Sequence, residues 1–205
     1  MSPTQMNMPV APSVLDPIPT RLNMKSGRPA AVLVGLTQRD MEWHVIMTER
    51  SAHLAHHAGQ ISFPGGKVED GDAGLVDTAL REAREEIALA AERVDVIGGL
   101  GQVMSPVGFI VQPVVGIVAE GARLSAYPNE VARILVLPLA DLVSSRSHRQ
   151  ESYLRDGRQR TVWVIDHEDH YIWGLSAAIL VDLATRMEDL SAGQASAVSI
   201  AELGT

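Results

Sequence analysis

The chain reads Gly65-Gly66-Lys67-Val68-Glu69-Asp70-Gly71-Asp72 and, nine residues further on, Arg81-Glu82-Ala83-Arg84-Glu85-Glu86-Ile87-Ala88-Leu89. Apolar residues recur at helical spacing through the second segment, which predicts a helix from about Leu75 to Leu89. Glu82, Glu85 and Glu86 occupy positions i, i+3 and i+4, so a helix makes them neighbours on one face. The sequence therefore predicts a glycine loop that leads into a helix with one buried face and one acidic face.

The three neighbouring glutamates favour a divalent cation. Like charges at this spacing repel one another, and a bound cation removes the repulsion. Ligands that are all oxygen, with no cysteine and no clustered histidine, indicate Mg²⁺ (or Mn²⁺) rather than Zn²⁺. A solvated acidic surface is the alternative, because charge runs commonly face water. The glycine loop at a fixed distance upstream favours the metal site.

The segment from Gly66 to Leu89 resembles the Nudix box, which is written G-x5-E-x7-R-E-U-x-E-E-x-G-U, where U is a bulky aliphatic residue. Arg81-Glu82, Glu85-Glu86 and Leu89 fall on this pattern. Three positions depart from it: Asp72 replaces the loop glutamate one residue further from Arg81, Ala88 replaces the late glycine, and Ala83 replaces the aliphatic residue. The resemblance implies the Nudix fold, an α/β/α sandwich with a mixed central sheet.

Segments on both sides of the box are similar to the coenzyme A diphosphatase branch of the Nudix hydrolases. Its signature reads LLTxR[SA]-x3-R-x3-G-x3-FPGG, and Ala55 stands where the signature has its internal arginine. The matching segments are Ile46-Met47-Thr48-Glu49-Arg50-Ser51, Gly59-Gln60-Ile61-Ser62-Phe63-Pro64-Gly65-Gly66, Pro128-Asn129-Glu130-Val131 and His170-Tyr171-Ile172-Trp173-Gly174-Leu175-Ser176-Ala177. The resemblance covers about Arg28 to Leu190. It implies metal-dependent hydrolysis of coenzyme A or acyl-CoA to 3′,5′-ADP and (acyl-)4′-phosphopantetheine.

Hydrolysis of a diphosphate needs positioning and neutralisation of charge at phosphorus. We therefore expect Glu82, Glu85 and Glu86 to bind Mg²⁺ together with the main-chain carbonyl of Gly66. Glu82 or Glu85 is also expected to orient or deprotonate the attacking water. Arg81, the fourth catalytic residue, is expected to hold the loop against the helix by pairing with Glu69 or Asp72.

Substrate phosphates are expected at Arg50, Gly65, Gly66 and Lys67. Glycine suits this role because a backbone without Cβ approaches phosphate and metal closely. Four weaker candidates are His56, His57, Glu130 and Trp173. Their alternatives are a polar loop for the histidines, a capping acid for Glu130 and core packing for Trp173.

Two other functions stay open, because Ala55 removes one expected arginine. One is hydrolysis of another nucleoside diphosphate derivative, such as a dinucleotide or an ADP-sugar. The other is a catalytically silent Nudix domain that senses a nucleotide. The intact glutamate trio favours an enzyme over a sensor.

Composition limits the class of protein. The 205 residues are 46% hydrophobic and 20% charged, which is enough for one domain with a substantial core. A net charge of −8 argues against a nucleic-acid partner, and no apolar run reaches the length of a membrane span. The absence of cysteine fits a reducing, cytoplasmic location, and Met1–Met24 lacks the pattern of a secretory signal. A homodimer is one option that the sequence leaves open.

The chain divides into an N-terminal arm at 1–27, a Nudix domain at 28–190 and a mobile C-terminal tail at 191–205. We expect a short helix at Val14–Leu22, a hairpin around Asp156-Gly157, and a terminal helix at Trp173–Asp189. Tyr171 and Ile172 are expected to extend the second hairpin strand. The remaining expected strands are 30–36, 44–50, 60–63, 95–104, 109–119 and 134–137.

Overall fold

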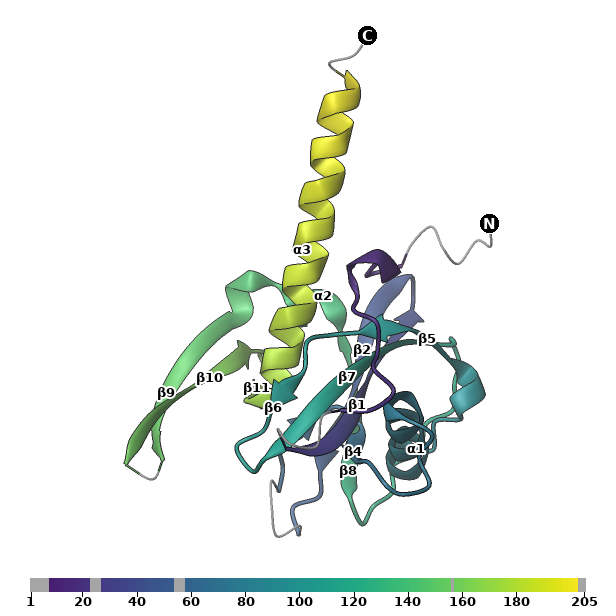
Figure 1. Cartoon of the computed structure of the whole chain (residues 1–205), viewed down its shortest axis with the longest axis vertical. Helices are drawn as coiled ribbons and strands as arrows, with labels where there is room; N and C mark the ends of the chain where they lie inside the picture. Colours follow the sequence, from purple (N-terminus) through teal and green to yellow (C-terminus); the bar gives the residue numbers. More distant parts are fainter. Residues whose placement is uncertain (1–7, 23–26, 54–57, 156, 203–205) are drawn as a thin grey trace.

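The computed structural model describes residues 8–22, 27–53, 58–155 and 157–202. Within this part of the chain, eight strands form one mixed sheet at the centre of the molecule (Figure 1). They are β1 (Arg28–Arg39), β2 (Glu42–Arg50), β3 (Ile61–Ser62), β4 (Gly65–Lys67), β5 (Val94–Gly99), β6 (Val103–Met104), β7 (Phe109–Val118) and β8 (Val131–Pro138). β1 runs parallel to β7 and antiparallel to β2 and β4, so the sheet is mixed, as expected.

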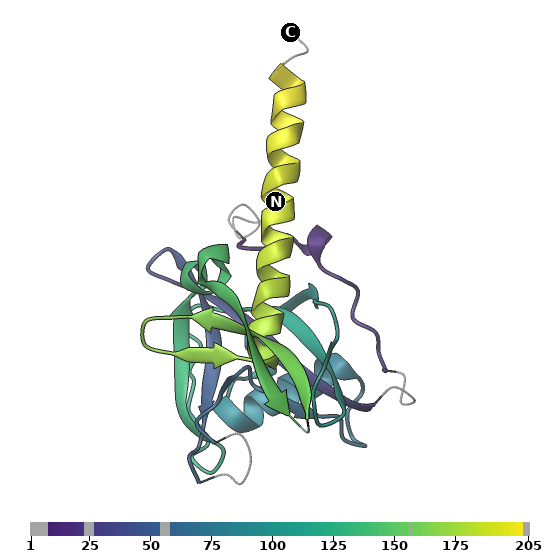
Figure 2. The ribbon, with the colours of Figure 1, turned by 90° about the vertical axis from the view of Figure 1, so that its left-hand side faces the viewer.

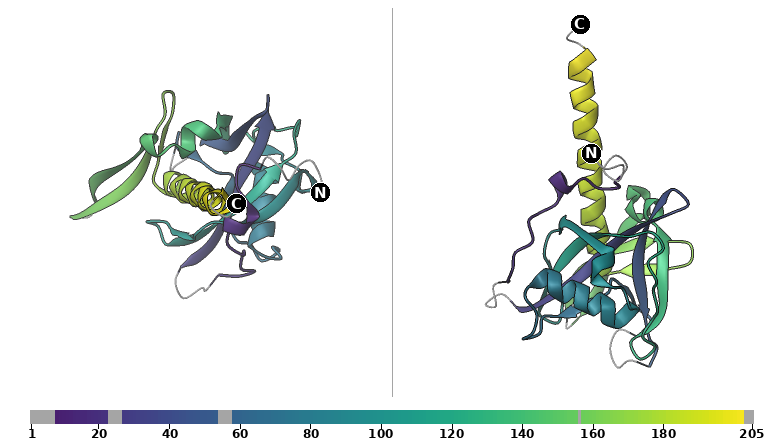
Figure 3. Two further views of the ribbon diagram at one scale, coloured as in Figure 1. Left: turned by 90° about the horizontal axis from the view of Figure 1, so that it is seen from above. Right: turned by 90° about the vertical axis from the view of Figure 1, so that its right-hand side faces the viewer.

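Helices cover both faces of this sheet. β1 directs alternate residues to opposite faces, and this separates the core into two clusters. Ala31 and Leu33 pack with α1 (Leu75–Ile87), whereas Val32 and Val34 pack with α2 (Leu139–Val143) and α3 (Leu175–Glu202). The predicted α/β/α sandwich is confirmed. In Figure 3, right, α1 crosses the front of the sheet and α3 lies behind it.

A second, three-stranded sheet stands beside the main body. It consists of β9 (His148–Arg155), β10 (Arg158–Asp166) and β11 (Tyr171–Trp173). The predicted hairpin is present, but Tyr171 and Ile172 do not extend its second strand: they turn back and pair antiparallel with it, Ile172 opposite Ile165. The polar residues between Asp166 and Tyr171 form the turn that reverses the chain. Figure 3, left, shows β9 and β10 reaching outward beyond α3.

Glycines split the strand that was expected at 95–104. β5 ends at Gly99, and three residues, Leu100, Gly101 and Gln102, separate it from β6. Residue Gly98 has φ +154, and a Cβ there would lie 2.6 Å from Leu15 Cβ. Because no other residue fits so close to the N-terminal segment, the chain bends here and the two strands pair with different parts of β7.

The helix expected at Val14–Leu22 is absent. A short 3-10 helix at Pro12–Val14 is followed by extended chain, and Asp16 bridges to Gly99. Pro17 and Pro19 explain the error, since proline inside a helix removes a backbone hydrogen bond and clashes with the preceding turn. Arg186 of α3 fixes this segment by donating to Val14 O at 2.8 Å and to Asp16 at 2.7 Å.

The terminal helix is longer than expected. α3 continues to Glu202 rather than ending at Asp189 and extends away from the body (Figures 1 and 2). Residues 191–202 contain four alanines and no proline, so they favour a helix although they are not strongly amphipathic. The mobility of 191–205 and the division into arm, domain and tail stay predictions. Among the helices of the described residues, none is sufficiently long and apolar to cross a membrane.

Candidate functional site

The glycine bend at β4 packs between β1 and α1. β4 pairs with Ala30–Val32, which brings Gly65 and Gly66 against two different neighbours. A Cβ on Gly65 would lie 2.4 Å from the carbonyl oxygen of Ala31, and a Cβ on Gly66 would lie 2.4 Å from Glu82 Oε1. The bend thus needs glycine twice, once for the sheet and once for the carboxylate of the helix.

The three helix glutamates differ in their surroundings. The side chain of Glu82 is 13% exposed and that of Glu85 is 52% exposed, whereas the whole of Glu86 is only 4% exposed. Glu86 Oε2 is buried without a hydrogen-bond partner among the described residues, and the backbone amide of Gly65 bonds to the same carboxylate. Sequence spacing predicted neighbours on one acidic face, but Glu86 lies at the edge of the buried face.

Burial controls the ionisation of Glu86. Loss of hydration and, to a smaller extent, the nearby charge of Glu82 together raise the pKa of Glu86 to about 8, while the charge of Arg50 opposes the shift. Burial also raises the pKa of Glu82, against the attraction of Arg81. A positive charge placed near these two carboxylates would therefore stabilise their ionised forms.

Arg81 connects the loop to the helix. Its Nε donates to Asp72 Oδ1 at 2.8 Å, which confirms the expected pairing with Asp72. Its Nη1 donates to Glu82 Oε1 at 3.1 Å and Glu85 Oε2 at 3.0 Å, and its Nη2 donates to Lys67 O at 3.0 Å. Every nitrogen of this guanidinium is engaged within the loop and helix, so Arg81 acts as a clamp.

Glu69 does not pair with Arg81. Its carboxylate lies 3.7 Å from the ammonium of Lys67, and both side chains are largely exposed. Lys67 therefore keeps its side chain at the surface beside the bend, while its carbonyl oxygen binds the clamp.

Asp72 is supported by a residue that the sequence reasoning did not single out. Thr78 donates from Oγ1 to Asp72 Oδ2 at 2.8 Å and is fully buried on α1. The amide of Glu69 donates to the same oxygen at 2.9 Å. A threonine within the apolar stripe of the helix was the available signal, because a buried hydroxyl needs a partner.

These contacts predict acid sensitivity. The Arg81 guanidinium lowers the pKa of Asp72 from 3.8 to about 2, so this group stabilises the fold above about pH 4 and loses that effect as the pH falls towards 2. We expect Asp72→Asn to lower the free energy of unfolding by about 2 kcal/mol at neutral pH and by much less near pH 2. Urea denaturation at both pH values measures the difference. Asp70→Asn, at an exposed position of the same loop, is the matched control and should change neither value. An equal loss from Asp72→Asn at both pH values would contradict this interpretation.

A second loop closes the site opposite the glycine bend. The amide of Ser51 donates to Glu130 O at 2.9 Å, its Oγ donates to Pro128 O at 2.8 Å, and the amide of Tyr127 donates to Glu86 O at 2.9 Å. After burial and the charges within the site, the charge of Glu130 also raises the pKa of both Glu82 and Glu86. Ser51 is a positioning residue that the sequence reasoning missed.

Arg50 is the one predicted phosphate contact that reaches this space from β2. Its charge lowers the pKa of Glu86, and its Nε is buried without a hydrogen-bond partner among the described residues. Trp173 lies instead in β11, opposite Val164, beside a separate cavity of about 320 Å³ lined by Glu49 and Arg133. Ala55, His56 and His57 lie outside the described residues.

The donor set fits a hard divalent cation. Glu86 Oε2 is buried without a hydrogen-bond partner in the described part of the chain, and the Glu82 carboxylate lies so close to Gly66 that a Cβ there would be 2.4 Å from it. The donors are all oxygen atoms. As the side chains stand, however, no three His, Cys, Asp or Glu residues within the described ranges are grouped to hold a metal ion. Glu85 stands apart, bonded to Arg81 and half exposed. Metal binding by all three glutamates and Gly66 thus stays a prediction.

The late glycine of the box has a visible counterpart. Ala88 ends α1 in the left-handed conformation, with φ 54, and its amide donates to Arg84 O at 3.0 Å. Glycine is favoured at this position of a helix end because it lacks a Cβ. Ala88 therefore adopts the backbone conformation expected of the glycine in the Nudix box, although it is not glycine.

Comparisons with known proteins agree with this geometry. A family profile described as NUDIX domain matches residues 27–162. A Cronobacter sakazakii protein described as uncharacterized Nudix hydrolase NudL is 42% identical over 160 residues, which span 78% of this chain and 83% of the relative. A Photorhabdus laumondii protein with the same description is 38% identical over 174 residues, spanning 85% and 92%. The solved binary complex of C. elegans Ap4A hydrolase shares the fold, with TM-score 0.51 and 14% identity over 82% of this chain and 98% of that chain.

Proposed function

The chain belongs to the Nudix family of hydrolases, which cleave phosphorus-containing anhydrides, and on that premise we propose that it hydrolyses the diphosphate bond of coenzyme A or acyl-CoA. The products are 3′,5′-ADP and 4′-phosphopantetheine, or its acylated form. The reaction requires Mg²⁺ or Mn²⁺, takes a small-molecule substrate rather than a nucleic acid, and takes place in the cytoplasm. A monomer and a homodimer both fit this proposal.

The observation that carries the proposal is the buried carboxylate of Glu86. It lies beside Glu82 and against the Gly65 amide, with one oxygen that has no partner in the described part of the chain. Such a group costs free energy unless a cation or a proton neutralises it. A divalent cation bound there supplies positive charge to phosphate oxygens and lowers the pKa of a bound water.

The protein groups around this point have separate tasks. Glu82, Glu85 and Glu86, with the carbonyl of Gly66, would hold the cation, and for Glu85 this would require exchange of its ion pair with Arg81. Arg50 contacts a substrate phosphate, because its buried Nε lacks a partner among the described residues and its charge already reaches Glu86. Gly65 and Gly66 let the backbone approach the phosphate closely. Glu82 or Glu85 orients or deprotonates the water, and Lys67 adds positive charge at the exposed rim.

The choice of coenzyme A depends on sequence rather than on geometry. The segments at 46–51 and 59–66 carry the signature of the coenzyme A branch, and the latter contains the glycine bend itself. Position 55 differs, because it is alanine where the signature has arginine, and the missing guanidinium weakens the support for this substrate. A dinucleotide or an ADP-sugar is therefore the second candidate, and a nucleotide sensor without turnover is the third.

A substrate panel separates these functions. The purified protein is incubated with Mg²⁺ and coenzyme A, acetyl-CoA, a diadenosine polyphosphate or ADP-ribose, and the products are resolved by chromatography. Preferential release of 3′,5′-ADP from the coenzyme A compounds supports the proposal. Faster cleavage of ADP-ribose or of the dinucleotide selects the second candidate, and nucleotide binding without any cleavage selects the sensor.

A further inference from the structure

A second cavity lies away from the glutamates, between the outlying hairpin and the main sheet. It measures about 590 Å³, within the range of roughly 300–1,000 Å³ that is typical of small-molecule pockets. β6, the loop that follows it, β9, β10 and the start of α3 form its walls. The apolar residues of these walls are Val103, Met104, Pro106, Val162, Trp163, Leu175 and Ala178.

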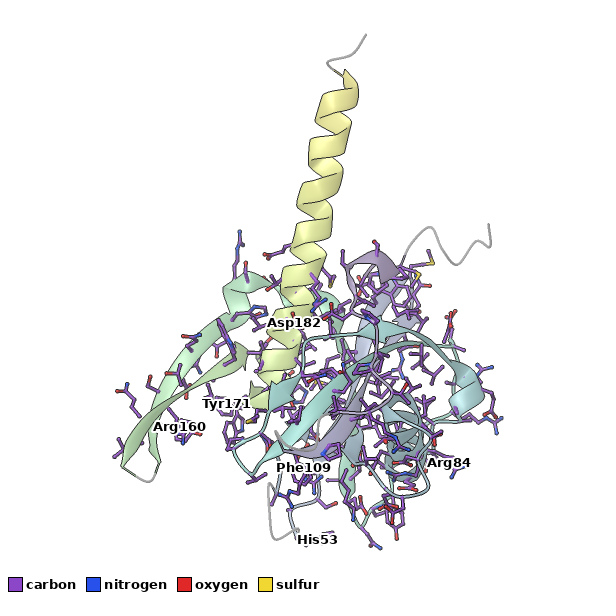
Figure 4. All side chains as sticks on the ribbon, in the orientation of Figure 1. His53, Arg84, Phe109, Arg160, Tyr171 and Asp182 are labelled. Carbon is purple, nitrogen blue, oxygen red and sulfur yellow. The ribbon has the colours of Figure 1, made fainter. Side chains whose placement is uncertain are left out.

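The cavity walls also carry a few polar side chains, none of which is acidic among the described residues. Ser105, Tyr153, Arg160 and Thr161 are the polar side chains that line the cavity, and no carboxylate lines it within the described residues. Arg160 is exposed and lies on the hairpin side in Figure 4. An apolar pocket with few polar groups suits a hydrocarbon chain better than an adenine ring, whose amino group needs an acceptor.

Strand register connects this cavity to the glycine bend. Lys67 of β4 lies opposite Ala30 of β1, which lies opposite Val111 of β7, which in turn lies opposite Val103 of β6. One row of the sheet therefore runs from the bend to the cavity wall across three strand spacings, or about 14 Å. An elongated substrate can span this separation.

The rim of the cavity at the start of β7 offers a suitable surface. Phe109, labelled in Figure 4, begins β7 and adjoins the cavity, because its amide donates to Ser105 Oγ and its carbonyl accepts from the Ser105 amide. The guanidinium of Arg28 lies 4.0 Å from the centroid of its ring and donates to Val107 O at 2.8 Å. The rim thus has a flat apolar surface and a fixed positive charge, which suit an amide-containing arm that leads away from a diphosphate.

We propose that this cavity binds the acyl chain of an acyl-CoA thioester, so that acyl-CoA is preferred over free coenzyme A. This inference rests on the proposed function, because it takes the diphosphate of the same substrate to lie at Glu82 and Glu86. Each methylene group that leaves water strengthens binding by about fourfold, so an eight-carbon chain should lower KM by at least about tenfold. Since the contacts lie far from the scissile bond, kcat should change little.

The test fills the cavity from two sides. Ala178→Phe places a ring in it from α3, and Val162→Trp does so from β10, so that one variant remains if the other fails to fold. Thr185→Phe puts the same ring on an exposed position two turns further along α3 and is the matched control. Steady-state kinetics with octanoyl-CoA and coenzyme A give the ratio of the two KM values, and calorimetry gives the affinity for S-octanoylpantetheine, which has no diphosphate.

The expected ratio of KM for coenzyme A to KM for octanoyl-CoA is at least about ten in the unchanged protein and in Thr185→Phe, and falls to about one in both filled variants. Affinity for S-octanoylpantetheine should fall in parallel, with a negative heat-capacity change of binding in the unchanged protein. If both filled variants keep the ratio and the affinity, the proposal is overturned.

Failure of the proposed function gives a different result. In one outcome, the unchanged protein does not cleave coenzyme A but binds S-octanoylpantetheine, and the filled variants lose this binding. The substrate assignment is then wrong, while the assignment of the cavity as an apolar binding site stands. If cleavage of coenzyme A is found and S-octanoylpantetheine does not bind, the substrate assignment stands and the cavity is not an acyl site.

Discussion

Replacing Glu86 with glutamine is expected to lower kcat by at least about 10²- to 10³-fold and to leave the fold intact. Glutamine keeps the size of the side chain and can still accept from the Gly65 amide, but it removes the negative charge that a cation needs. Without a cation, a carboxyl group with a pKa of about 8 is mostly protonated at neutral pH, so the neutral amide resembles it. Thermal stability in the presence of a chelator should therefore be unchanged or higher.

Two measurements separate this account from a loss of folding. Added Mg²⁺ should raise Tm of the unchanged protein, because a ligand that binds only the native state stabilises it. The same addition should leave Tm of Glu86→Gln unchanged. Glu92→Gln, the same substitution at an exposed site beyond the end of α1, should keep both turnover and the response to Mg²⁺. Full turnover in Glu86→Gln would remove Glu86 from the site.

The two glycines of the bend should respond to alanine in opposite ways. In Gly65→Ala, the new Cβ meets the backbone of Ala31 at 2.4 Å and Val32 Cα at 2.6 Å, and neither can move without the sheet. We expect a loss of about 3 kcal/mol in the free energy of unfolding, the upper range for overpacking. In Gly66→Ala, the Cβ meets the end of the Glu82 side chain, which can rotate away.

Gly66→Ala should therefore keep most of its stability and lose turnover by about 10²-fold, because Glu82 is displaced from the bend. Urea denaturation and steady-state kinetics on the same preparations give both quantities. Gly71→Ala is the matched control in the adjoining loop, since nothing lies within 4 Å of its new Cβ. Equal losses of stability in Gly65→Ala and Gly66→Ala would mean that Glu82 is not free to move as the contacts imply.

The sequence predicted most of what local spacing determines. α1 was expected at Leu75–Leu89 and is found at Leu75–Ile87, because its apolar stripe and its contacts with β1 agree. The sequence also predicted that Arg81 pairs with an acid of the loop, but it left Glu69 and Asp72 as alternatives, and the structure selects Asp72. The prediction of a helix at Val14–Leu22 was wrong, because Pro17 and Pro19 keep this segment extended.

Spacing could not predict which glutamate is buried. Positions i, i+3 and i+4 make Glu82, Glu85 and Glu86 neighbours, but the rotation of α1 on the sheet places Glu86 at the buried edge and leaves Glu85 with Arg81. This rotation depends on long-range packing with β1 and β7. The cavity beside Trp163 is another such feature, because it forms only where the hairpin, β6 and α3 meet.

Binding of a divalent cation at the glycine bend is the central claim, and diffraction from crystals soaked in Mn²⁺ tests it most directly. The account predicts an anomalous peak bounded by carboxylate oxygens of Glu82 and Glu86 and the carbonyl oxygen of Gly66, and no peak at that point in crystals of Glu86→Gln. A peak elsewhere, or a bend without a peak at saturating Mn²⁺ while Glu86 keeps its present contact with the Gly65 amide, would contradict it.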